Sequence, residues 1–201
     1  MTRMERLAKL ALKRFRRDAR GIAAVEFALV APVLVSMLIG AIDVSRAVAL
    51  NQRVSLVTQM VADLAARETQ LTAADVRAIY DIAELAMEPY ATDTLKIAII
   101  PVMSAANDAK KTLVYPSTTN RETHPAGFEL PQCQAYPLID GFLATNESVI
   151  VVETSYDYAP LWLPREVFPP VTWQKKAYAK PRKSLCVGFD GANCTSSCFS
   201  S

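Results

Sequence analysis

A single glutamate interrupts the longest apolar segment of the chain. Residues 22–42 contain no charged side chain other than Glu26. At about 1.5 Å per residue, a helix of this length would cover about 30 Å and could cross the hydrocarbon core of a membrane. An ionised side chain at the centre of such a span is unfavourable by about 2.5 to 3.5 kcal/mol, so it commonly marks a functional site. Glu26 is therefore the first candidate functional residue.

Other residue patterns that support catalysis are scarce. The chain has one histidine, His124, and it lacks a Gly-x-Ser-x-Gly motif, a metal-spaced His/Glu set and a Gly-rich phosphate loop. Glu153 and Asp157 could form a glycosidase pair, but acids on an exposed strand are usually solvated. We therefore predict that the protein is not an enzyme and that it uses no cofactor and no metal.

Basic residues are concentrated ahead of the apolar segment. Residues 1–21 hold eight of the 22 Lys and Arg and two of the 20 acids, so the remainder has a net charge of −4. This asymmetry predicts a cytoplasmic N-terminus and an exported C-terminal part. The segment exceeds the core of about 7 to 15 residues in a signal peptide, which favours a retained membrane helix over a signal peptide. No clustered basic and aromatic surface follows, so nucleic acid is not predicted as a partner.

The cysteines fit export to an oxidising compartment. All four, Cys133, Cys186, Cys194 and Cys198, follow the apolar segment. An even number predicts two disulfides, for which three pairings are possible. A bond from Cys186 to Cys194 or to Cys198 would close a short terminal loop. A zinc site is the alternative, but the cysteine spacing is not that of a zinc ribbon and His124 is distant in sequence.

Two helices are predicted. The first continues past the apolar segment to about residue 67, because an apolar stripe recurs every three or four residues at Ala47, Leu50, Val54, Val57, Val61 and Leu64. This stripe could pack on the chain's own exported domain or form a seam between subunits. The second helix starts at an N-cap in Thr72-Ala-Ala-Asp75 and ends near Glu88. Its predicted apolar face consists of Val76, Ile79, Tyr80, Ala83 and Leu85.

Alternation of apolar and polar residues predicts antiparallel strands after the helices. The strands are Leu95–Met103, Lys111–Tyr115, Glu147–Tyr158 and Val171–Lys180. Residues 116–146, rich in Pro and Gly, are predicted as a loop with one helical turn near residues 138–143. The order predicts an α+β fold: a basic leader (1–21), a transmembrane helix (22–42, continuing to about 67) and an exported domain (68–201).

The segment from Gly21 to Phe27, Gly-Ile-Ala-Ala-Val-Glu-Phe, resembles the start of a type IV prepilin. With an aromatic residue directly after Glu26, it is similar to the TadE/TadF-like minor pilins of the Flp/Tad pilus family. The stretches Val151–Tyr158 and Ala177–Arg182 also resemble the closing strands of that family. The resemblance implies a type IV pilin-like fold and cleavage between Gly21 and Ile22 by a prepilin peptidase. It also implies a place in the bacterial inner membrane, a periplasmic domain, and other Tad pilins and assembly-platform proteins as partners.

The resemblance gives the Glu26 carboxylate a physical role. Cleavage after Gly21 would create an α-amino group on Ile22 that is positively charged at neutral pH. Glu26, one helical turn away, could neutralise that amine on a neighbouring subunit and offset the cost of burying both charges. Alternatively, the Glu26 side chain extends to the cytoplasmic interface and pairs with nothing. The sequence thus predicts a minor pilin or pseudopilin of a Flp pilus. The alternative function is a single-pass anchored periplasmic binding module that uses the Pro-rich loop around Trp162, Leu163 and Phe168.

Overall fold

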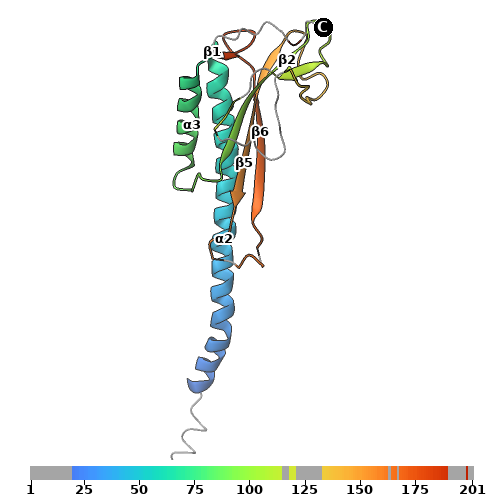
Figure 1. The fold of residues 1–201 in the computed structure, drawn as a ribbon. Coiled ribbons are helices and arrows are strands. Elements are labelled where there is room, and N and C mark those ends of the chain that lie inside the picture. Colours follow the sequence, from blue (N-terminus) through green and yellow to red (C-terminus); the bar gives the residue numbers. More distant parts are fainter. Residues whose placement is uncertain are drawn as a thin grey trace, which may run out of the picture. The chain divides into compact units, whose positions relative to one another are not determined.

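The computed structural model describes residues 20–114, 118–120, 133–162, 164–166, 168–189 and 198, and for Arg20 only the backbone. The chain divides into two compact units. The first comprises Met1–Ser45 with Leu161–Leu163, and the second, called the C-terminal domain below, comprises Arg46–Pro160 with Pro164–Ser201. Long apolar helix, second helix and antiparallel sheet follow one another along the chain, so the predicted α+β fold is confirmed (Figure 1).

Helix α2 (Arg20–Arg67) runs through Pro32 and continues into the C-terminal domain. Within that domain, five of the six residues of the predicted stripe are buried and Leu64 is partly buried. The buried five are Ala47, Leu50, Val54, Val57 and Val61. They pack against α3 and the sheet of the same chain. This packing removes the apolar face of the helix from water, which is energetically favourable. A seam between subunits is therefore not the role of these positions.

Helix α3 (Ala73–Met87) starts at the predicted N-cap. The backbone N–H of Asp75 donates to Thr72 Oγ1 at 3.2 Å, and the Thr72 N–H donates to Asp75 Oδ2 at 2.9 Å, which forms a capping box. These hydrogen bonds to Thr72 lower the pKa of the Asp75 carboxyl. At the other end of α3, Arg53 Nη1 donates to the Ala86 carbonyl at 2.8 Å and links the helix to α2.

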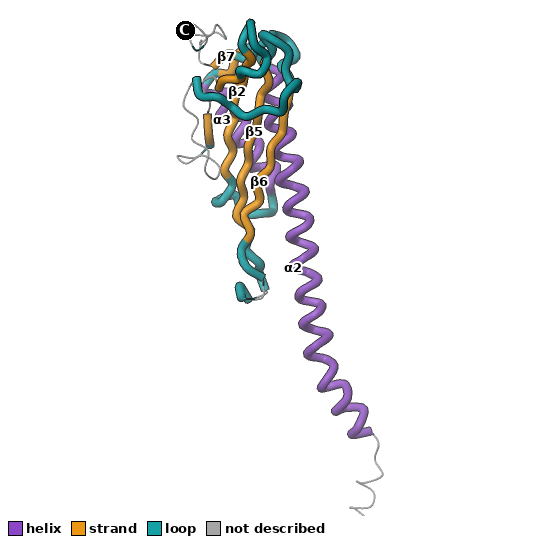
Figure 2. The backbone as a smooth tube through the Cα atoms, turned by 90° about the vertical axis from the view of Figure 1, so that its right-hand side faces the viewer, coloured by secondary structure: helices purple, strands orange, loops and turns teal. Residues whose placement is uncertain are grey.

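The main sheet contains the four predicted strands in the order β3-β2-β5-β6. These are β2 (Lys96–Ser104), β3 (Thr112–Val114), β5 (Ser148–Tyr158) and β6 (Val171–Ala179), and every pairing between them is antiparallel. The short strand β4 (Thr118–Thr119) pairs with β2. Figure 2 shows β2, β5 and β6 side by side, with β6 at the edge of the described sheet.

Each face of the sheet carries its own apolar cluster. Alternate residues of β2 and β5, such as Ile97, Ile99 and Val152, pack against α2 and α3. The residues between them, such as Ile100 and Val151, pack on the opposite face with Tyr136 and Leu143. Both faces are covered, and ten of the eleven residues of β5 are buried, all except Asp157. Burial on both faces fits the uninterrupted apolar runs in the two central strands, Ile97–Met103 in β2 and Val149–Val152 in β5.

Three local predictions were wrong or incomplete. Leu85 is exposed and Met87 is buried instead. Met87 lies four residues after the buried Ala83 and therefore on the same face of α3, whereas Leu85 lies only two residues after it. Residues 138–143 form no helix, only a turn closed by a hydrogen bond from Phe142 N–H to the Ile139 carbonyl. The parallel pair β1 (Gln70–Leu71) and β7 (Gly188–Phe189) was not predicted, because two-residue strands leave no periodic pattern.

Candidate functional site

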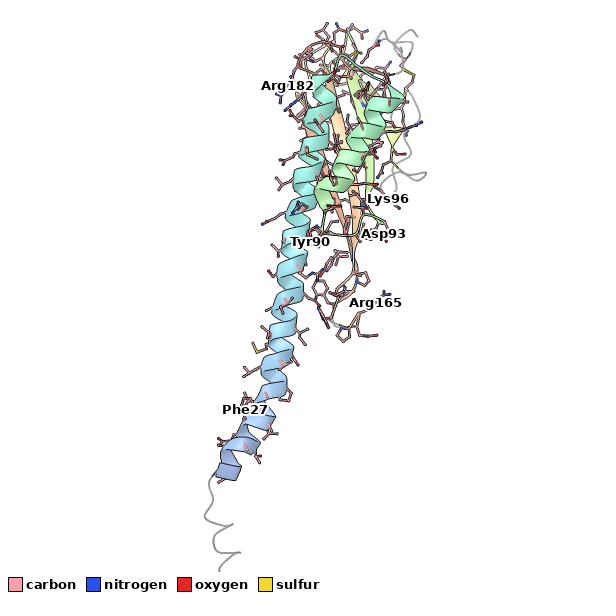
Figure 3. The ribbon with its side chains drawn as sticks, turned by 90° about the vertical axis from the view of Figure 1, so that its left-hand side faces the viewer. Phe27, Tyr90, Asp93, Lys96, Arg165 and Arg182 are labelled. Atoms are coloured by element: carbon pink, nitrogen blue, oxygen red, sulfur yellow. A yellow bond between two sulfur atoms is a disulfide. The ribbon has the colours of Figure 1, made fainter. Side chains whose placement is uncertain are left out.

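The prepilin-like motif lies at the start of α2 on an exposed part of the helix. Gly21, Ile22, Glu26 and Phe27 are all solvent-exposed, and Figure 3 shows Phe27 near the beginning of the helix. Ile22 and Glu26 are one helical turn apart, about 6 Å along the axis, and lie on the same side of α2. The helix therefore places the backbone nitrogen of Ile22 and the Glu26 side chain about one turn apart on the same exposed side.

Packing within the described part of the chain does not explain the glycine at position 21. A β-carbon added to Gly21 would have no atom within 4 Å, apart from its chain neighbours and the nearby backbone of its own helix. The residue has helical backbone geometry. Glycine in a helix interior is less favourable than alanine by about 1 kcal/mol. Contacts with the described residues therefore do not require glycine at this position.

The apolar part of α2 has no protein cover. The helix contains an 18-residue window that is apolar enough to cross a membrane, and none of this window is buried. Its exposed large side chains include Val25, Leu29, Val30, Val33, Leu34, Met37 and Leu38. Soluble monomeric proteins rarely expose a continuous apolar surface of this extent. One such helix near the N-terminus is consistent with a single-pass membrane anchor.

Glu153 is not the solvated surface acid that the sequence predicted. Its residue is only 6% exposed, and its carboxylate accepts a hydrogen bond from the Tyr136 hydroxyl at 2.8 Å and contacts Lys176 Nζ at 2.5 Å. Burial, together with the hydrogen bond to Glu153, raises the pKa of the Tyr136 phenol, so Tyr136 stays protonated and remains a donor. Asp157 makes a separate hydrogen bond with Thr172, so the two acids do not form a catalytic pair.

Replacing Tyr136 by phenylalanine is expected to lower the free energy of unfolding by about 1.5 to 3 kcal/mol. The substitution removes a hydrogen bond to a charged group and leaves the buried Glu153 carboxylate with one fewer donor. Urea unfolding of the oxidised chain in detergent would measure the change. Tyr178→Phe is the matched control, because Tyr178 is half exposed and its loss of a hydroxyl should change the stability by less than about 0.5 kcal/mol. Equal effects of the two substitutions would contradict a role for the Tyr136 hydrogen bond.

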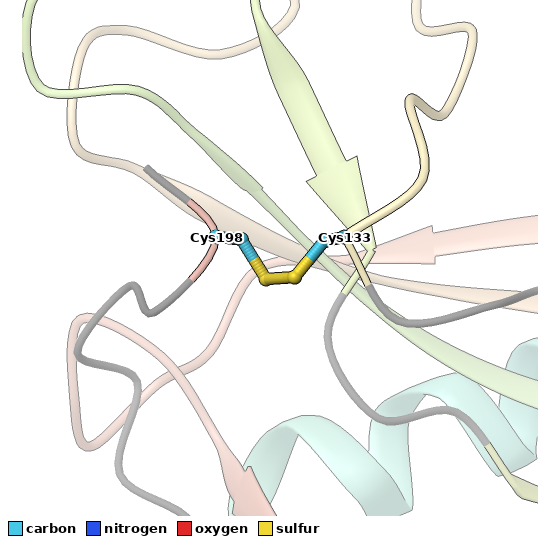
Figure 4. The surroundings of a disulfide bond; sticks show 2 residues. All are labelled: Cys133 and Cys198. Carbon is cyan, nitrogen blue, oxygen red and sulfur yellow. A yellow bond between two sulfur atoms is a disulfide. The ribbon is translucent and has the colours of Figure 1, made fainter. Parts of the chain in front are cut away.

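The structure contains a disulfide between Cys133 and Cys198 (Figure 4). This pairing excludes the short loop that a bond between Cys186 and Cys198 would close. Cys186 is also disulfide-bonded, but Cys194 lies outside the described residues. No group of three or more His, Cys, Asp or Glu that could hold a metal occurs among the residues that the structure describes, and His124 lies outside them.

Among the described residues of the C-terminal domain, two open cavities lie beside α2, and neither has the groups of an active site. The larger, about 580 Å³, lies between α2 and β6. It is lined by Gln59, Ala62, Asp63, Lys176–Lys180 and Arg182, and its acid Asp63 is paired with Arg67 and Arg182. The second, about 540 Å³, is lined mainly by apolar residues of α2 with Ala86 and Tyr90. Neither cavity combines a nucleophile with a base.

The loop between β5 and β6 contains one partly buried and one exposed aromatic side chain among its described residues. Phe168 packs against the core with its ring edge-on to Tyr158, at a centroid distance of 6.2 Å. Trp162, in contrast, is 66% exposed, and Leu163 lies outside the described residues. The backbone N–H of Trp162 donates to Asp43 Oδ2 at 3.0 Å. Sequence patterns did not single out Asp43 or Tyr136, although Asp43 is the first charge after the apolar segment.

One comparison with known proteins finds a family that the start of α2 resembles. The model of the TadE-like protein family matches residues 21–69, which include the whole prepilin-like motif and nearly all of α2. No significant match was found to a curated protein or to a solved structure. The matched segment, which begins at Gly21 and carries Glu26 and Phe27, is similar to the corresponding part of TadE-like proteins and supports a TadE-like, pilin-related protein.

Proposed function

We propose that the chain is a minor pilin or pseudopilin that takes part in assembling a Flp (Tad-type) type IVb pilus. In this role it is inserted in the bacterial inner membrane as a single-pass protein and processed by a prepilin peptidase after Gly21. Other Tad pilins and the proteins of the assembly platform are its partners. The family match supports a part in Tad pilus assembly, and the finer steps are the proposal.

The observation that carries the proposal is the combination of motif and exposure at the start of α2. Gly21, Glu26 and Phe27 stand at the spacing of a prepilin, on a helix whose apolar surface has no cover within the described chain. The family match begins at Gly21, directly at the proposed cleavage site. A glycine that the packing does not need and a carboxylate that no described residue covers both fit recognition by other proteins in the membrane.

The proposed orientation is N-terminus in the cytoplasm and C-terminal domain in the periplasm. Eight Lys or Arg precede the apolar segment, and positive charge favours the cytoplasmic side. The disulfide between Cys133 and Cys198 supports the same orientation, because such bonds persist in the oxidising periplasm and are rare in the cytosol.

Mass spectrometry of the chain extracted from membranes tests the processing step. We expect the mature protein to begin at Ile22, and the same protein from a strain without the prepilin peptidase to begin at Met1. An intact Met1 in the parent strain would contradict processing. A cut near Ala41 would instead indicate an ordinary signal peptide.

A single-pass anchored binding module is the second candidate, and the exposed Trp162 favours it. The two candidates differ in their dependence on cleavage. A binding module should work uncleaved, so its function should survive deletion of the peptidase, whereas a pilin that depends on a free Ile22 amine should not.

A further inference from the structure

Two large apolar side chains project from the loop between β5 and β6. Leu161 is 60% exposed and Trp162 is 66% exposed, although leucine and tryptophan are usually well buried on average. Prolines at positions 160 and 164 flank them and restrict the backbone. The other tryptophan, Trp173, is partly buried and stacks on Tyr158 at a centroid distance of 5.0 Å. The core of the C-terminal domain therefore does not account for Trp162.

A hydrogen bond joins the backbone of Trp162 to the side chain of Asp43 on α2. The Trp162 N–H donates to Asp43 Oδ2 at 3.0 Å, and Asp43 is only 2% exposed. Both residues belong to the same compact unit of the chain. Asp43 directly follows Ile42, the last residue of the apolar segment. The backbone of Trp162 thus lies one hydrogen bond away from the end of the segment that would cross the membrane.

Tryptophan at this level has a specific physical preference. Trp is enriched at the boundary between hydrocarbon and lipid headgroups, where its ring is removed from water and its N–H can still find an acceptor. We propose that Leu161 and Trp162 form a membrane-interface anchor that binds the phospholipids of the periplasmic leaflet, and that Asp43 is the positioning residue of this anchor. The inference rests on the proposed insertion of α2 in the membrane, and it adds a second lipid contact far from α2 in sequence.

Fluorescence of Trp162 in lipid vesicles tests the anchor. The full chain with Trp173→Phe, which keeps an aromatic ring at position 173, would be reconstituted in vesicles of phosphatidylethanolamine and phosphatidylglycerol. We expect its emission at shorter wavelength than that of tryptophan in water, and loss of about half of its intensity when the lipids are brominated near the headgroup. The chain with Trp162→Phe, which keeps only Trp173, should not be quenched.

Flotation of the vesicles separates failure of the anchor from failure of the proposed insertion. A chain that floats with the vesicles but whose Trp162 is not quenched would overturn the anchor and leave insertion intact. A short-wavelength emission without quenching would have the same meaning, because it would place Trp162 inside protein. A chain that does not float would overturn both proposals.

The role of Asp43 has its own comparison. In the same Trp173→Phe background, Asp43→Asn keeps a side-chain oxygen that can accept the Trp162 N–H, whereas Asp43→Ala removes it. We expect quenching of Trp162 to be retained with asparagine and reduced with alanine, while circular dichroism shows the same helix content. Equal quenching in the two variants would overturn the positioning role of Asp43.

Discussion

Replacement of Glu26 by alanine is expected to leave cleavage after Gly21 largely intact and to reduce the number of pili per cell by on the order of tenfold or more. If the carboxylate neutralises the Ile22 amine of a neighbouring subunit, its removal leaves that amine buried without a partner. Breaking a buried ion pair in this way costs about 3 to 5 kcal/mol. Since about 1.4 kcal/mol corresponds to a factor of ten in an equilibrium constant, a tenfold loss is a lower bound.

Electron microscopy of the cells and mass spectrometry of the extracted chain would measure piliation and cleavage in the same cultures. Glu26→Asp is the matched control, because it keeps the charge and shortens the side chain by one methylene, so it should lose less than the alanine variant. Normal piliation with Glu26→Ala would favour a carboxylate that extends to the cytoplasmic interface and pairs with nothing. Loss of cleavage in that variant would show that Glu26 acts in processing and not in assembly.

A second large effect is expected at the end of α3. Met87→Ala should lower the free energy of unfolding by about 2 to 5 kcal/mol, because it removes a fully buried side chain from the cluster between the helices and the sheet and leaves a cavity. Leu85→Ala, two residues earlier, should change the stability by less than about 0.5 kcal/mol, because Leu85 is 65% exposed.

Urea unfolding of the two variants in detergent, followed by near-ultraviolet circular dichroism, would compare them directly. Alanine is a slightly better helix former than either residue it replaces, so helix propensity cannot produce the expected loss. A larger effect at Leu85 than at Met87 would show that the end of α3 is packed differently from the structure described above.

The sequence predicted most of the fold because its signals are local. The capping box at Thr72 and Asp75, the stripe from Ala47 to Val61 and the alternation along β5 each follow from residues close together in the chain. Leu85 was assigned to the wrong face of α3, because it does not follow Ala83 at the three- or four-residue spacing of the buried side chains. Met87 is the last residue of α3, and its burial results from its contacts with the rest of the core.

The environment of Glu153 could not be predicted for a different reason. Its partner Lys176 lies opposite Glu153 in the pairing of β5 with β6, and its partner Tyr136 comes from a loop that bonds to Thr112 of β3, so only the tertiary fold brings the three side chains together. The hydrogen bond between Asp43 and Trp162 likewise joins residues 119 positions apart. The cleavage motif, in contrast, is contiguous in sequence, which is why the sequence alone was enough to propose it.

The disulfide between Cys133 and Cys198 has a consequence for the order of events during export. The covalent loop that it closes contains all of β5 and β6, the two strands with the longest pairing in the sheet, and β7. In the proposed orientation the bond can form only after these three strands have crossed the membrane, because both thiols must reach the oxidising side. A chain in which Cys133 and Cys198 are joined has therefore already had this part of its sequence translocated.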